Sequence, residues 1–143
     1  MAEPRTPAKA RPSDAAIGSG LGRVLLLVYG IFAVSAGARA GVQIATKFSE
    51  APLAFLLSAF AALVYIAATV GLAIGGTRGR LIALTSCSIE FAGVLVVGTL
   101  SVLDKEAFPD PTVWSQFGSG YGYVPLVLPL VGLWWLWRNR PRP

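Results

Sequence analysis

The chain has 143 residues, of which 55% are hydrophobic and 13% are charged, and its formal net charge is +5. Soluble domains average about 25% charged residues, so this composition excludes an ordinary globular core. The basic residues lie at the ends of long apolar runs and are not interleaved with aromatic residues, which argues against nucleic-acid binding. We therefore expect an all-helical membrane protein, a bundle of four transmembrane helices in a lipid bilayer.

Residues 1–20 are rich in Pro, Ala and small polar residues and are predicted to form a disordered cytoplasmic tail. The first predicted span covers about residues 24–46 in the domain 21–138. A competing interpretation takes the basic start, the apolar run and the small residues at 38–40 as a secretory signal, so that residues 1–40 would be cleaved. The apolar pattern continues beyond that point, which favours an uncleaved span.

The second and third spans are predicted at about residues 53–74 and 81–103, joined by a basic turn at 75–80. The second is uncharged and follows Pro52, which suits the first turn of a helix. The third contains a single charged residue, Glu90. At about 1.5 Å per residue, each stretch reaches across the roughly 30 Å of a hydrocarbon core.

Residues 104–120 contain charged residues and two proline-bounded turns, and are predicted to form an outer loop. Its acidic residues lack the spacing of a calcium site and predict a solvated loop. Its aromatic residues are too apolar to extend into water, so we expect the loop to lie on the membrane surface or to cover the outer mouth of the bundle. These residues are Phe108, Trp114 and Phe117.

The last span is predicted at about residues 121–137, followed by a basic cytoplasmic tail at 139–143. Pro129 is expected to kink this helix, which membrane helices tolerate when neighbours satisfy the freed carbonyl. Two lysines fall on one predicted side, Lys47 and Lys105, and nine basic residues on the other: Arg5, Lys9, Arg11, Arg23, Arg78, Arg80, Arg138, Arg140 and Arg142. The positive-inside rule then predicts a multi-pass plasma-membrane protein with both ends in the cytoplasm.

Charged residues in hydrocarbon cost about 2.5 to 3.5 kcal/mol on insertion scales, so Glu90 and Arg39 are the first candidates for a functional site. Arg39 lies about 24 Å along its helix from the inner edge, within reach of the outer headgroups, and is predicted to be an interface anchor. Glu90 lies about 13 to 14 Å from that edge, near the midplane. The difference in depth, about 10 Å, argues against an ion pair between them.

Tyr65 is predicted to lie close to the level of Glu90, and Ser86 is one turn away on the same helix. We expect Glu90 to be largely protonated at neutral pH, because hydrocarbon disfavours its charged form, and to hydrogen-bond Tyr65 or Ser86. This carboxyl group then either holds helices together or has a proton-linked or ligand-linked role. Gln43 completes the candidate polar site, on the same face of the first span as Arg39.

Small residues four apart permit close helix packing. The pairs Gly37 with Gly41 and Gly71 with Gly75 have this spacing in the first and second spans. We expect them to pack within the monomer; contact with a membrane-protein partner or a second copy of the chain is the alternative.

The sequence has no histidine and one cysteine, Cys87, and no nucleophile–base pair is apparent. We expect no metal, no cofactor and no enzymatic activity. The leading hypothesis is a non-catalytic accessory or scaffold subunit of a membrane complex. The alternative is an oligomeric proton-linked transporter of small or lipophilic solutes that uses Glu90; a membrane enzyme ranks last.

Two sequence segments within residues 22–137 are similar to a known family of proteins. These segments are VQIATKFSEAPLAFLLSAFAALVYIAATV and IEFAGVLVVGTLSVLDKEAFPDPTVWSQFGSGYGYVPLVLPLVGL. These resemble a family of small actinobacterial four-helix integral membrane proteins of unknown function, which implies the fold and no activity. Small four-helix multidrug exporters are similar in size and also have one membrane carboxylate. Their essential glutamate is on the first helix, however, whereas Glu90 is on the third predicted span.

Overall fold

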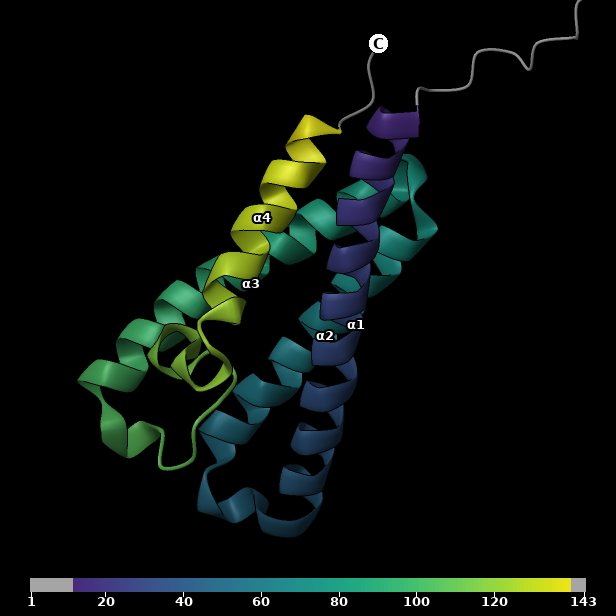
Figure 1. Cartoon of the computed structure of the whole chain (residues 1–143). Helices are drawn as coiled ribbons and strands as arrows, with labels where there is room; N and C mark the ends of the chain where they lie inside the picture. Colours follow the sequence, from purple (N-terminus) through teal and green to yellow (C-terminus); the bar gives the residue numbers. More distant parts are fainter. Residues whose placement is uncertain (1–11, 140–143) are drawn as a thin grey trace, which may run out of the picture.

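The computed structural model describes residues 12–139, with the side chains of residues 20–139, and all its regular structure is helical. Three helices are long and apolar enough to cross a membrane, and a bent pair of helices forms a fourth candidate span. These helices are compatible with a membrane protein. In chain order the elements are α1 (Pro12–Lys47), η1 (Phe48–Glu50), α2 (Pro52–Ile74), α3 (Gly76–Leu103), η2 (Lys105–Ala107), η3 (Ser115–Tyr121) and α4 (Val124–Arg138) (Figure 1).

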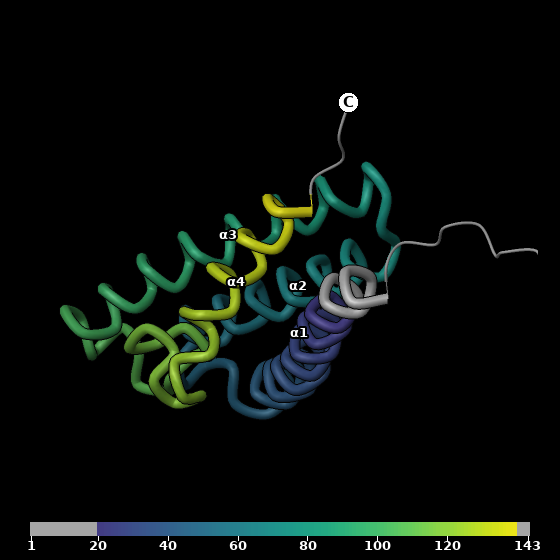
Figure 2. Tube along the Cα trace, turned by 45° about the horizontal axis from the view of Figure 1, so that its top comes forward, coloured from purple at the N-terminus to yellow at the C-terminus, as the bar shows by residue number. Residues whose placement is uncertain are grey.

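The α2–α3 turn lies at the same end of the bundle as the start of α1 and the end of α4 (Figures 1 and 2). We call this the basic end, because Arg78, Arg80 and Arg138 lie there. The opposite end, with η1 and η2, is the loop end. Helix α1 packs mainly on α2, α2 on α3, and α3 on both α4 and η3.

Two helices begin earlier than the sequence predicts. Helix α1 starts at Pro12 instead of near residue 24, so residues 12–20 are helical where a disordered tail is predicted. Proline suits a first helical turn, and no further proline lies between residues 13 and 47 to interrupt the helix. Residues 1–11 and 140–143, which hold the rest of that tail and most of the basic tail, lie outside the described residues.

Helix α3 starts at Gly76 instead of near residue 81, which shortens the predicted basic turn. The reversal is made by Gly75 and Gly76, whose φ angles are 68° and 69°. Only glycine adopts such angles without a Cβ penalty, so the reversal needs these two residues and the arginines after them join the helix. Both Arg78 and Arg80 therefore occupy the first turns of α3.

Helix α4 has 15 residues and by itself reaches about 22 Å, less than a hydrocarbon core. It is bent by 97° from η3, the element that precedes it. Positive φ angles at Gly118, Gly122 and Tyr123 produce this bend, so the helix begins at Val124 and not at the predicted residue 121. Pro129 lies inside α4, as the sequence predicts.

Helices α2 and α3 approach each other most closely where Gly71 faces Gly79. A Cβ atom on Gly71 would lie 2.7 Å from the Ala83 backbone nitrogen, and one on Gly79 would lie 2.5 Å from the Gly71 carbonyl oxygen. This crossing therefore requires glycine at both positions. By contrast, Gly75 lies in the turn, and a Cβ there would meet no atom within 4 Å.

Candidate functional site

A cluster of buried polar side chains lies between α1 and α3 and is centred on Glu90, whose exposed fraction is 0%. The Tyr29 hydroxyl donates a hydrogen bond to Glu90 Oε1, with an oxygen–oxygen distance of 2.6 Å. The same hydroxyl lies 3.2 Å from the Cys87 sulfur. Cys87 and Glu90 are three residues apart on α3, which places both on the helix face that Tyr29 meets.

Two further residues complete this cluster, Tyr65 of α2 and Trp114 of the loop before η3. Trp114 Nε1 donates to the Tyr65 hydroxyl at 3.0 Å, and both side chains are almost fully buried. The Tyr65 hydroxyl interacts with Glu90 electrostatically and through a side-chain hydrogen bond. Glu90 Oε2 has no hydrogen-bond partner. We call these five residues the polar core: Tyr29, Tyr65, Cys87, Glu90 and Trp114.

The structure brings Tyr65 to Glu90, as the depths along the helices predict, and Tyr29 donates a second, short hydrogen bond to the same carboxyl group. Ser86 is buried and forms no described hydrogen bond with Glu90. Tyr29 was not predicted as part of the site, although its position in the sequence carried a signal. Tyr29 is six residues past Arg23 and therefore about 9 Å from the predicted inner edge, within a few ångströms of the depth of Glu90.

The predicted outer loop enters the bundle through its aromatic residues. The Trp114 ring lies against Gly93 of α3, where a Cβ atom would approach it to 2.5 Å, and the Phe117 ring lies against Gly98. Phe108 is also buried. Of the two positions predicted for this loop, the structure shows the one that covers the mouth of the bundle. Glycines at 93 and 98 were the sequence signal for it.

The polar face of α1 contacts this loop and does not reach Glu90. Arg39 Nη1 donates to the Tyr121 hydroxyl at 2.7 Å, and Lys47 Nζ lies 3.4 Å from an Asp110 carboxylate oxygen. Gln43 is buried, and its side-chain oxygen has no partner. Arg39 and Gln43 therefore lie apart from the polar core, although they were predicted to share one candidate site with Glu90, Tyr65 and Ser86.

The hydrogen bond between Tyr29 and Glu90 is expected to contribute to stability. The Tyr29→Phe substitution keeps the ring but leaves Glu90 Oε1 buried without its donor, which should cost about 1 to 2 kcal/mol. Chemical unfolding in mixed micelles measures this change. Tyr123→Phe is the matched control, because the Tyr123 side chain is exposed and loss of its hydroxyl should leave the unfolding free energy unchanged. Equal effects of the two substitutions would contradict the role given to the bond.

Among the described residues, no three Cys, Asp or Glu side chains lie together in a way that could hold a metal ion. No protein-family model, curated protein or solved structure matches this chain. The resemblance to an actinobacterial membrane family therefore stays a prediction.

Proposed function

We propose that this chain is a non-catalytic accessory or scaffold subunit of a complex in the plasma membrane. It crosses the bilayer four times, with η3 and α4 together forming the last crossing, and keeps both ends in the cytoplasm. In support of this orientation, Arg78 and Arg80 lie in the first turns of α3 and Arg138 at the end of α4, all at the basic end, whereas Lys47 ends α1 and Lys105 begins η2 at the loop end.

The observation that carries the proposal is the enclosure of Glu90. Its side chain has no exposed surface, and one of its oxygens is used in a hydrogen bond that connects α3 to α1. A carboxyl group that moves protons across a membrane must exchange them with water, and the Trp114 loop covers the approach from the loop end. A buried, bonded carboxyl group is instead what helix-to-helix attachment requires.

The alternative, an oligomeric proton-linked transporter, draws support from Glu90 Oε2, a buried acceptor with no partner. In that case the oligomer would open a path to Glu90. The two functions differ in what the near-isosteric change Glu90→Gln does, since glutamine still accepts the Tyr29 hydrogen bond but cannot exchange a proton.

A face for a partner is available on α1. A Cβ atom added at Gly37 or Gly41 would meet nothing within 4 Å, in contrast to the crossing at Gly71 and Gly79. The predicted packing of this pair inside the monomer is thus absent from the structure. We call Gly37 and Gly41 the open α1 face, and in the proposal it accepts a helix of the partner protein.

The test is affinity capture of the tagged chain from native membranes, with quantitative mass spectrometry of the membrane proteins that accompany it. The double variant Gly37→Leu with Gly41→Leu should lower the amount of captured partner at least about tenfold, because the two leucine side chains fill the face that the partner's helix must approach. Glu90→Gln should leave the captured complex unchanged.

The matched control is Ala38→Leu with Val42→Leu, one residue further along the helix and about 100° around it. Both of these positions are exposed, and the control should retain the partner. The proposal fails if the two leucine pairs act alike. It also fails if the wild-type chain reconstituted in vesicles shows proton-coupled uptake and the Glu90→Gln variant does not, which is the result that the transporter predicts.

A further inference from the structure

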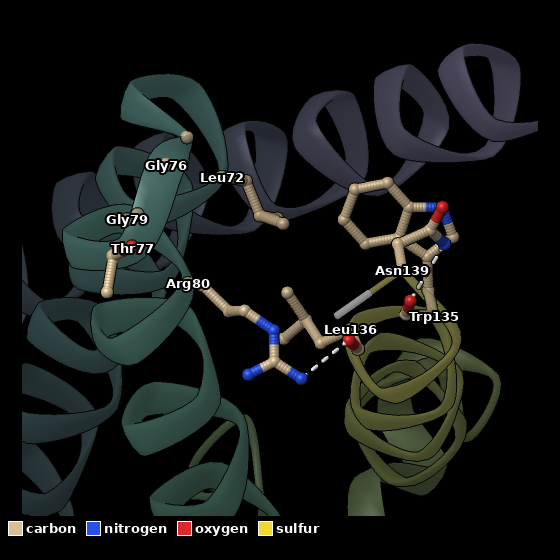
Figure 3. A pocket seen from close by; sticks show the side chains of 10 residues that line it. Leu72, Gly76, Thr77, Gly79, Arg80, Trp135, Leu136 and Asn139 are labelled. Carbon is tan, nitrogen blue, oxygen red and sulfur yellow. Dashed lines mark hydrogen bonds between the residues drawn. The ribbon is translucent and has the colours of Figure 1, made fainter. Parts of the chain in front are cut away.

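A partly enclosed cavity of about 370 Å³ lies at the basic end, between the α2–α3 turn and the last turn of α4 (Figure 3). This volume is in the range of sites that bind small molecules or headgroups, about 300 to 1,000 Å³. The cavity is separate from the polar core and from the open α1 face. The lining side chains that matter here are Leu72, Thr77, Arg80, Trp135, Leu136 and Asn139.

Two side chains that line this cavity have a buried hydrogen-bond donor without a partner. Arg80 extends from α3 toward α4, where its Nη2 donates to the Leu136 carbonyl oxygen at 2.9 Å (Figure 3). Arg80 Nε is buried without a partner, and so is Trp135 Nε1. Neither side chain can accept a hydrogen bond, and an arginine cannot lose its charge.

Arg80 also lacks a neutralising carboxylate, because none of the described acidic residues forms an ion pair with it. Two further cations, Arg78 in the first turns of α3 and Arg138 at the end of α4, add positive potential at the same end of the bundle. A buried donor without an acceptor destabilises the fold. An anionic group with several oxygen atoms would satisfy both Arg80 and Trp135, and the planar guanidinium is suited to two oxygens of a phosphate.

The remaining walls are apolar. The Leu72 and Leu136 side chains and the Trp135 ring face the same space as the donors (Figure 3). A pocket with basic groups and apolar walls at the end of a helix bundle matches a lipid, whose phosphate meets the donors while its glycerol and acyl carbons contact the leucines. We propose that this cavity binds the phosphate group of an anionic membrane lipid, independently of the partner proposed for the open α1 face.

The experiment titrates the full chain in detergent micelles with dioleoylphosphatidylglycerol and counts bound lipids by native mass spectrometry. Arg80→Gln should weaken binding by about tenfold or more, as expected for loss of charge-assisted hydrogen bonds. Arg78→Gln removes the same charge two residues away on the same helix, but Arg78 is exposed and does not line the cavity. This control should change the affinity less than about twofold, a surface-charge effect.

Trp135→Phe provides a second variant that keeps the apolar wall and removes only the indole N–H. It should weaken lipid binding about threefold or more, the loss of one hydrogen bond, with an unchanged melting temperature as a check on folding. Dioleoylphosphatidylcholine, which has a phosphate but no net charge, should bind more weakly than the anionic lipid and show little dependence on Arg80.

Three results would overturn the proposal. In the first, Arg78→Gln and Arg80→Gln weaken binding equally, so that general surface charge accounts for it. In the second, Trp135→Phe and Arg80→Gln both fold and bind the anionic lipid as the wild type does. In the third, inorganic phosphate binds with the same dependence on Arg80 while the lipid does not bind, which identifies a free anion as the ligand.

Discussion

Gly93→Ala is expected to lower the free energy of unfolding by about 3 kcal/mol, in the range of changes that displace a large core side chain. The added methyl group would lie 2.5 Å from Trp114 Cζ3 and 2.8 Å from Cη2. The indole must then leave its site, which breaks its hydrogen bond to the Tyr65 hydroxyl. Chemical unfolding in mixed micelles gives the magnitude, and a red shift of tryptophan emission would report the displaced ring.

A second substitution tests whether the indole is the cause. The atoms that the new methyl group would meet belong to the six-membered ring of Trp114, and Trp114→Phe shortens the side chain there. The double variant Gly93→Ala with Trp114→Phe should therefore be more stable than the sum of the two single changes, by about 1 to 2 kcal/mol. Simple additivity would show that the Trp114 loop does not occupy this site.

The positions of the three long helices follow from their hydrophobic runs. Residues 53–74 form an uncharged stretch in the sequence, and α2 spans Pro52–Ile74. A helix that crosses a hydrocarbon core needs a long apolar run, so the sequence alone predicts where such helices lie. Helix ends outside the core face no such demand. Nothing in residues 12–20 or 76–80 prevents a helix from continuing, and both α1 and α3 do so.

The bend before α4 shows a different limit. It depends on positive φ angles at Gly118 and Gly122, which glycine permits, but also at Tyr123, and η3 before it has positive φ angles at Gln116 and Phe117. Side chains of these three kinds rarely adopt such angles, and no local pattern marks them. The span predicted from residue 121, with its kink at Pro129, therefore differs from the structure at its start, where η3 and the bend precede a helix that begins at Val124.

For the candidate site, simple depth arithmetic was more informative than residue type. It separated Arg39 from Glu90 and brought Tyr65 to the right level. Which side chain donates to Glu90 depends on the rotation of α1 about its own axis. A hydrophobic run that has no polar stripe at the depth of Glu90 does not specify this rotation. The insertion of Trp114 depends on a contact between residues 21 positions apart, Gly93 and Trp114, which becomes visible only once the loop is folded back.

Two glycine pairs with the same four-residue spacing have different surroundings in the structure. Gly37 with Gly41 and Gly71 with Gly75 look alike in the sequence, yet only Gly71 lies in a tight contact, and its counterpart is Gly79 of the next helix. A small residue removes a steric barrier without saying which helix will approach. The approaching helix must itself present backbone, as α3 does at Gly79, and for the open α1 face the described residues provide no such surface.

Gly71→Ala is accordingly expected to have a large effect for a single methyl group, a loss of at least about 3 kcal/mol in the free energy of unfolding. The new Cβ would lie 2.7 Å from the Ala83 nitrogen and 2.8 Å from the Gly79 carbonyl oxygen. Both are backbone atoms, so no side-chain rotation can relieve the contact and α2 must move away from α3. Chemical unfolding in mixed micelles again measures the loss.

The control is the same substitution at Gly37, also in a helix interior but with nothing within 4 Å of the new methyl group. Gly37→Ala should be neutral or stabilise the protein by about 0.5 to 1 kcal/mol, since alanine loses less backbone freedom than glycine on folding. The difference between the two variants isolates the crossing of α2 and α3 from helix propensity. A Gly71→Ala variant as stable as Gly37→Ala would mean that the two helices do not cross at Gly71 in the folded protein.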